Sequence, residues 1–283
     1  MKKGDLKIGD KNYPLLLKEV KSPPKSLKYK GDFNNDFLKY AVAVVGSRKI
    51  TNYGRSALEK LVSEIARAGI TVVSGFMYGV DALAHQSAID NGAKTVAVLP
   101  CGVDVVHPSY QRKLYQSVLK NGFFLSEYED SALPAKWTYP KRNRIVVGIT
   151  KALLVIEAKE KSGSMISADF AKKYNRKIFA VPGSIFSSTS KGTNKLIKEG
   201  ATAVDSGDEI ISFLGKKIDK NDKNTDFLEK DEQDVLSVIK KRPIEADQIA
   251  RILKRSSFDV SSALSSLEIK GLVKKNGRLY FSI

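Results

Sequence analysis

The chain has 283 residues, of which 42% are hydrophobic and 28% charged, a balance typical of a globular protein that can bury one large core or one large and one small core. Its single cysteine excludes an internal disulfide framework, its two histidines argue against a catalytic zinc site, and no apolar run approaches the roughly 18 residues of a membrane span. The N-terminal residues lack the apolar stretch of a signal peptide, so we expect a cytoplasmic protein.

The net charge is strongly positive, with 48 Lys and Arg against 31 Asp and Glu, a balance of +17. Residues 226–283 contribute only +2, so the surplus lies in the larger N-terminal part of the chain. Such a surplus favours a polyanionic partner, because binding releases condensed counterions. A lysine-rich composition that serves only solubility is the alternative.

Residues 1–37 contain three prolines and little periodicity, and we interpret them as an N-terminal arm with a short ordered piece at Tyr13–Val20. After them, short apolar runs alternate with amphipathic stretches. The expected strands are Ala41–Val45, Ile70–Val73, Thr95–Leu99, Phe123–Ser126, Ala152–Ile156 and Lys177–Val181. The expected helices are 54–69, 81–92, 110–121 and 164–174, with a helix or turn at 144–148 and a last helix opened by Lys191. This alternation predicts an α/β fold, a Rossmann-like, doubly wound, mostly parallel sheet over residues 38–214.

The end of the chain shows a different pattern. Residues 215–225 are polar and charged without an apolar face, which predicts a linker. Residues 226–283 read as three helices followed by a hairpin with an Asn-Gly turn at Asn276-Gly277, the pattern of a small winged-helix domain. Its third helix, Val260–Lys270, carries four serines and one cation, so a protein contact is at least as well supported as reading of duplex DNA.

Small, polar and basic residues follow several predicted strands, at the edge where open parallel sheets bind ligands. These residues are Gly46, Ser47, Arg48, Gly75, Ser162, Ser164, Lys191 and Asn194. Each group alone is compatible with an ordinary turn, but together they favour an edge where backbone N–H groups meet phosphates. Neither G-x-G-x-x-G nor a P-loop is present, so we expect no nucleotide cofactor.

A second cluster lies at residues 136–151, which hold five basic residues and no acidic one beside Trp137 and Tyr139. Aromatic rings next to cations suit a single strand, whose bases stack while its phosphates meet the cations. The alternative is a solvated charged loop, with Arg144 paired to Glu157.

Five motifs carry a resemblance to the DprA/Smf family of DNA-processing proteins, over nearly all of residues 10–283. They are GSR at 46–48, SGFMYGVDALAH at 74–85, YPKRNRIVVGIT at 139–150, VIEAKEKSGSMISADFA at 155–171 and FAVPGSIFSSTSKGTNKLIKEGA at 179–201. The resemblance implies sequence-independent binding of single-stranded DNA, homodimerisation through the Rossmann-like domain, and loading of the RecA recombinase onto incoming DNA in natural transformation. It implies no catalytic residues and no metal.

By residue, the resemblance implies that Ser47 and Arg48 are phosphate ligands and that Tyr139 stacks on a base. The residues that would line or complete the pocket are Lys141, Arg142, Asn143, Arg144, Ser162, Ser164, Lys191 and Asn194. Two features depart from the family pattern: the residues before the sheet are too few for the helical domain that often precedes it, and His107-Pro108 stands where Tyr-Pro is usual.

Two other functions remain open. A nucleotide phosphoribohydrolase on a similar fold would need a PGGxGTxxE motif, from which Pro182-Gly183-Ser184-Ile185 departs without a glutamate at the required spacing. A duplex-binding regulator would need a more basic third helix in the winged unit.

Three residues that could carry chemistry have structural interpretations. Asp81 is expected to cap a helix and His85 to pack in the core, and Cys101 has no evident base to activate its thiol.

Overall fold

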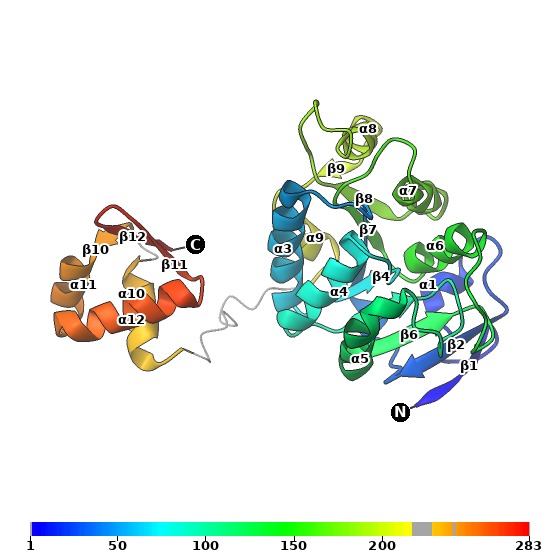
Figure 1. The fold of residues 1–283 in the computed structure, drawn as a ribbon, viewed down its shortest axis with the longest axis horizontal. Helices are drawn as coiled ribbons and strands as arrows, with labels where there is room; N and C mark the ends of the chain where they lie inside the picture. Colours follow the sequence, from blue (N-terminus) through cyan, green and yellow to red (C-terminus); the bar gives the residue numbers. More distant parts are fainter. Residues whose placement is uncertain (1, 217–227, 240–241, 283) are drawn as a thin grey trace. The chain divides into compact units, whose positions relative to one another are not determined.

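The computed structural model describes residues 2–216, 228–239 and 242–282, and the chain divides into two compact units, residues 1–218 and 219–283 (Figure 1). Apart from Gly215 and Lys216, the predicted linker at 215–225 lies outside the described residues. Within the described ranges, no helix is long and apolar enough to cross a membrane.

The first unit is built on a sheet that, within residues 2–216, has nine strands in the order β1-β2-β6-β5-β4-β3-β7-β8-β9. The strands are β1 (Lys3–Lys7), β2 (Ser26–Gly31), β3 (Ala41–Val45), β4 (Thr71–Ser74), β5 (Thr95–Val98), β6 (Gly122–Ser126), β7 (Ala152–Val155), β8 (Lys177–Ala180) and β9 (Thr202–Ala203). All neighbours from β6 to β9 are parallel, while β1 and β2 pair antiparallel at one edge.

Helices cover both faces of this sheet (Figure 1). They are α1 (Leu15–Lys18), α2 (Asp36–Lys39), α3 (Asn52–Arg67), α4 (Val80–Asp90), α5 (Arg112–Asn121), α6 (Thr138–Gly148), α7 (Gly163–Lys173), α8 (Lys191–Lys198) and α9 (Asp208–Phe213). Successive residues of β3 point to opposite faces, so Ala43 and Val45 pack with α6 and α7 while Val42 and Val44 pack with α3 and α4. The predicted doubly wound α/β fold is confirmed.

The strand order reverses between β3 and β7. From β3 the chain builds β4, β5 and β6 on one side, then returns to place β7, β8 and β9 on the other. The loops after β3 and β7 therefore diverge and leave a crevice at their carboxyl ends, where doubly wound sheets bind ligands.

The interpretation of residues 1–37 as an arm differs from the structure, in which β1 and β2 extend the sheet through pairing of β2 with β6. Their apolar signal is weak because these two strands bury few side chains: Leu6 is buried in β1 and Leu27 in β2, while most of the remaining side chains stay exposed or half-buried. Lys3 and Lys7 on the edge strand β1 also discourage pairing with another chain.

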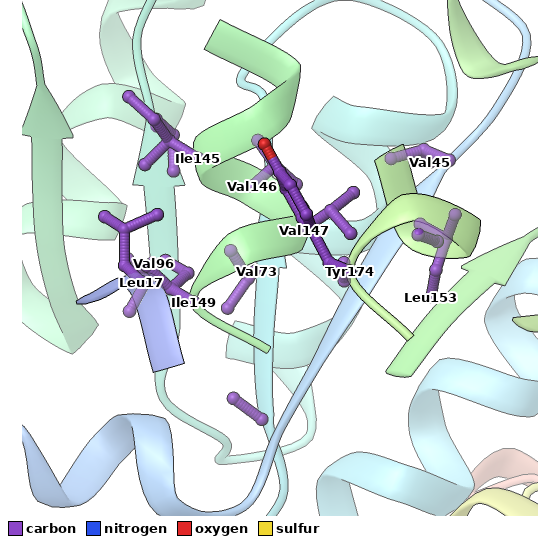
Figure 2. Packing of buried hydrophobic residues seen from close by; sticks show 14 of the residues in the cluster. Leu17, Val45, Val73, Val96, Ile145, Val146, Val147, Ile149, Leu153 and Tyr174 are labelled. Atoms are coloured by element: carbon purple, nitrogen blue, oxygen red, sulfur yellow. The ribbon is translucent and has the colours of Figure 1, made fainter. Parts of the chain in front are cut away.

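Helix α6 begins at Thr138, six residues before the predicted helix or turn at 144–148. Pro140 argues against a helix start at this point in the sequence. Proline is nevertheless tolerated in the first turn, because an N–H group there would have no intrahelical acceptor. Figure 2 shows Ile145, Val146 and Val147 of this helix lying over Val73, Val96 and Leu153 of the sheet. This burial fixes α6 at the crevice.

The second unit has its own small core. It contains α10 (Lys230–Ile239), β10 (Ile244–Glu245), α11 (Ala246–Leu253), α12 (Ser257–Ile269), β11 (Val273–Asn276) and β12 (Leu279–Ser282), with the strands in the order β10-β12-β11. Val235, Ile249 and Leu267 are fully buried between its helices. The predicted winged-helix pattern is confirmed, with β10 added to the hairpin.

Candidate nucleic-acid interface

A cavity of about 580 Å³ opens at the crevice between β3 and β7. It collects most of the predicted site residues, namely Gly46, Ser47, Arg48, Gly75, Tyr139, Arg142, Asn143, Ser162 and Ser164. The fold thus brings together residues more than 100 positions apart in the sequence, as the switch-point geometry requires.

Arg48 presents an exposed guanidinium at the rim of this cavity. It lies between two aromatic rings, 5.5 Å from the centroid of Tyr78 and 5.4 Å from that of Tyr139. The Tyr139 hydroxyl is in turn hydrogen-bonded to Nε2 of His107 at 2.8 Å. Within the described residues Arg48 forms no ion pair, so its charge is available to an anion.

The loop that carries Arg48 is fixed by its own hydrogen bonds and by α4. The Ser47 hydroxyl accepts from Lys49 N at 3.1 Å and donates to Lys49 O at 2.9 Å, so it is committed to the turn. Val80 N donates to Ser47 O at 3.1 Å. Gly79 makes this approach possible, because its φ is +79° and a Cβ there would lie 2.5 Å from the Arg48 carbonyl oxygen.

Arg142 lies on the inner wall of the cavity and only 4% of it is exposed. Its guanidinium donates to the carbonyl oxygens of Gly75 and Val98, at the ends of β4 and β5. Burial lowers the pKa of Arg142. Burial also raises the pKa of the neighbouring Asp81 carboxyl, and the positive charge of Arg142 offsets part of that rise. Arg142 therefore shapes the wall of the cavity instead of offering a free cation.

The N-terminus of α7 forms another wall. Ser162, Gly163 and Ser164 line the cavity, and the first turn of this helix contains no acidic residue. The Ser162 hydroxyl oxygen is buried and has no hydrogen-bond partner among the described residues. Asn143 donates its amide to Gly163 O at 3.2 Å and so ties α6 to this turn. A helix N-terminus with free N–H groups favours an anion.

The comparisons with known proteins are consistent with this geometry. A family model described as DNA recombination-mediator protein A matches residues 6–215, and a model of the DprA winged helix domain matches residues 220–276. The chain belongs to the DprA/Smf family.

Individual relatives support the assignment. The chain is similar to Protein Smf of Synechocystis sp., at 31% identity over 94% of this chain and 76% of that protein, and to DNA processing protein DprA of Streptococcus pneumoniae, at 40% identity over 72% of each. The crystal structure of the latter superposes with a TM-score of 0.70 at 39% identity, covering 74% of this chain and 73% of that one. DNA processing protein A of Helicobacter pylori, whose structure gives insight into its mode of binding single-stranded DNA, has a TM-score of 0.67 at 33% identity, covering 76% of this chain and 96% of that one.

Two cations of the DprA/Smf motif YPKRNRIVVGIT, Lys141 and Arg144, do not line the cavity. Arg144 forms an ion pair with Glu127 and also donates to Ser22 O at 3.1 Å. Lys141 Nζ lies 3.4 Å from the other oxygen of Glu127. Glu157, the partner that the alternative interpretation gave to Arg144, is instead held by Thr51 and Thr189 through three hydrogen bonds.

Lys191 and Asn194 also lie outside the lining of the cavity. The Asn194 side-chain amide makes two hydrogen bonds with the backbone of Gly183: it accepts from Gly183 N at 3.2 Å and donates to Gly183 O at 2.9 Å. It therefore fixes the loop after β8. Lys191 is exposed at the start of α8.

Three further cations line the cavity: Lys49 and Lys159, which the sequence analysis did not place in the site, and Lys136, which it placed in the 136–151 cluster but not among the site residues. All three are exposed, and within the described ranges none of them forms an ion pair. Their positions in the sequence could have identified them, because Lys49 follows β3, Lys159 follows β7 and Lys136 precedes α6. Sequence reasoning passed over them as site residues because lysines are abundant along the whole chain.

The remaining candidates for chemistry are buried. His85 Nδ1 lies 2.6 Å from the Thr95 hydroxyl, and desolvation lowers the pKa of His85 to about 3. Burial raises the pKa of the Cys101 thiol to about 11, which keeps it protonated near neutral pH. In the described part of the chain no three His, Cys, Asp or Glu side chains are grouped to hold a metal.

Proposed function

We propose that the chain binds single-stranded DNA without sequence preference in the cavity between β3 and β7. The observation that carries the proposal is the convergence of four exposed cations and the α7 N-terminus on one cavity, beside an aromatic ring that has a π face for any base. The relationship to the H. pylori protein, which binds single-stranded DNA, supports the same reading.

In this proposal the residues of the cavity have different roles. Arg48, Lys49, Lys136 and Lys159 meet phosphates, and the backbone amides at the start of α7 meet another. Tyr139 supplies a stacking surface and is held in place by His107. Arg142 and Asn143 hold the walls in place, since Arg142 binds the strand-end carbonyls and Asn143 ties α6 to the start of α7.

Titration of a labelled oligonucleotide at several salt concentrations tests the proposal. Each lost phosphate contact lowers the slope of log K against log salt by about 0.7 for a single strand, so Arg48→Ala and Lys136→Ala should each flatten the slope by that amount. Lys172→Ala is the matched control, because it removes the same charge from a residue already paired with Glu199. Equal slopes for all three variants would show that the cavity cations do not meet phosphates.

We further propose that the chain acts as a homodimer. The loop after β8 exposes Phe186 to 93% and Ile185 to 76%, next to a second cavity of about 570 Å³ lined by Tyr53, Gly183 and Ser184. Exposed apolar side chains of this size favour a protein contact, and a two-fold pair would offer two DNA cavities to one strand. Sedimentation of the wild type and of Phe186→Ser tests this: a dimer that dissociates in the variant supports it, and a monomeric wild type refutes it.

Loading of RecA onto incoming DNA in natural transformation is the process we propose for this binding activity, on the basis of family membership. The measurement is RecA-dependent ATP hydrolysis on single-stranded DNA coated with a single-strand-binding protein. We expect the chain to shorten the lag before hydrolysis and Arg48→Ala to restore it. A lag that the wild type leaves unchanged would remove this role without affecting DNA binding.

The phosphoribohydrolase alternative is not favoured. Family membership points to DNA processing, and Glu157, the buried carboxylate near the loop after β8, is fully engaged in holding Thr51 and Thr189. We propose no catalytic role for the chain.

A further inference from the structure

The chain contains one tryptophan, Trp137, and it lies on the surface with 62% of its area exposed. Large aromatic residues are normally at least partly buried because each removes 150–250 Å² of surface from water. This one is not among the residues that line the cavity between β3 and β7, and the proposed function gives it no role.

Its backbone is nevertheless held rigidly. Thr138 is 2% exposed and exchanges two hydrogen bonds with Ala135: its hydroxyl donates to Ala135 O at 2.8 Å and accepts from Ala135 N at 3.2 Å. Trp137 sits inside this closed turn, at the point where α6 begins. The backbone that carries the ring is therefore ordered before any ligand arrives, which lowers the entropic cost of a contact.

Two neighbouring side chains contact the Trp137 indole. Tyr128 meets it edge to face, with centroids 5.8 Å apart and the ring planes at 73°. Lys141 Nζ lies 5.8 Å from the Trp137 centroid and 5.7 Å from that of Tyr128. These contacts leave most of the indole uncovered, as its exposure shows.

The charge around the ring is positive. Glu127 is balanced by both Arg144 and Lys141, so the three groups together carry a net positive charge. Lys136, the residue before Trp137, lines the cavity and is exposed. Lys136 and Trp137 are neighbours in the chain, with Cα atoms about 3.8 Å apart, so the exposed indole starts from the backbone next to a cation that lines the cavity.

We propose that Trp137 is a stacking platform for one nucleobase just outside the cavity, on the path of a strand whose phosphate meets Lys136. This inference rests on the proposed function, since it extends the path of the same strand. A base of any kind can stack on an indole, so the platform adds affinity without adding sequence preference.

The single tryptophan makes the test direct, because indole emission reports only on this residue when it is excited at the red edge where tyrosine does not absorb. Oligothymidylate added to the full-length chain should quench this emission as it binds. An oligonucleotide of the same length built from abasic sites keeps the phosphates but has nothing to stack, so we expect it to bind more weakly and to leave the emission nearly unchanged.

Variants give the second readout. Trp137→Ala should weaken binding of labelled oligothymidylate by roughly five- to a hundredfold, the usual effect of removing one stacked aromatic, while Trp137→Phe should retain most of the affinity. Leu133→Ala is the matched control: Leu133 lies on the same loop and is 77% exposed, but it has no π face.

The outcomes separate this inference from the proposed function. If anisotropy shows no binding of single-stranded DNA to the wild type, the proposed function fails. If binding is present but the indole is not quenched and Trp137→Ala binds like the wild type, the platform alone fails. Equal losses from Leu133→Ala and Trp137→Ala would also overturn it, because the loop would then act as an apolar surface and not as a stacking site.

Discussion

Arg48 and Arg142 both line the cavity, but their surroundings are opposite. Arg48 is exposed between two rings, whereas Arg142 is buried and donates to two strand-end carbonyls. The sequence could not separate them, because both stand in basic polar motifs and only the position on α6 decides which side chain faces the sheet. For the same reason Arg144, two residues further along the helix, pairs with Glu127 instead of facing the cavity.

Arg142→Ala should destabilise the fold. Removing the guanidinium leaves the carbonyls of Gly75 and Val98 buried without donors, which costs about 1–3 kcal/mol for each unsatisfied group. Urea denaturation measures the change in the free energy of unfolding. Arg48→Ala serves as the comparison and should leave this free energy almost unchanged, and equal stability of the two variants would contradict the assignment of Arg142 to the wall.

His85 should make the fold sensitive to acid. Its pKa is lowered to about 3 in the folded chain but stands near 6.5 when unfolded, so between these values the unfolded state binds one more proton. The free energy of unfolding therefore falls by up to about 1.4 kcal/mol per pH unit as the pH drops from 6.5 toward 3, and this part of the stability is fully present above 6.5. Urea midpoints measured across this range test it, and His85→Gln should show a shallower decline. The same decline in both proteins would exclude His85 as its source.

At the scale of elements, the parallel strands and long helices could be predicted because their apolar periodicity is strong. The start of α6, the strands β1 and β2, and the two-residue parallel strand β9 could not be predicted. Pro140 looks like a helix breaker although it stands in a first turn, and a strand with one buried leucine, such as β1 or β2, has no visible alternation. Gly46, Ser47 and Arg48 were placed at the correct strand end, since that placement depends only on where β3 stops.

Gly79→Ala should disturb the site through the contact between two loops. The new Cβ would meet the carbonyl oxygens of Ser47 and Arg48, and the φ of +79° already disfavours alanine. We expect a loss of stability of about 1–3 kcal/mol and a loss of affinity for single-stranded DNA similar to that of Arg48→Ala.

Gly92→Ala is the matched control for this substitution. Its φ is +75°, but nothing lies within 4 Å of the position of a Cβ, so it should lose stability without losing DNA affinity. An equal loss of affinity in both variants would mean that backbone strain alone, and not the displacement of the Arg48 loop, explains the effect.

At the scale of the whole molecule, the positive charge is concentrated in the first unit. Residues 226–283 carry a net charge of only +2, and α12 contains no lysine or arginine between Ser257 and Ile269. The helix that would read duplex DNA in a winged-helix protein is thus poor in cations. Large exposed side chains, Phe258 at 82% and Ile269 at 88%, stand at its two ends.

Removal of the second unit should leave binding of single-stranded DNA intact. Because phosphate contacts dominate affinity and the cavity lies entirely in the first unit, a chain of residues 1–218 should bind within about twofold of the full-length chain at equal salt. Fluorescence anisotropy with the same oligonucleotide measures both. A much weaker truncated chain would assign part of the DNA contact to the winged-helix unit.

The reversal of strand order between β3 and β7 also has a consequence for synthesis of the protein on the ribosome. The cavity takes its first wall from residues near 46 and its last from residues near 167, so a nascent chain has no complete anion-binding surface until α7 has emerged and packed. Chains that end before α7 should therefore not be captured by nearby nucleic acid through this surface.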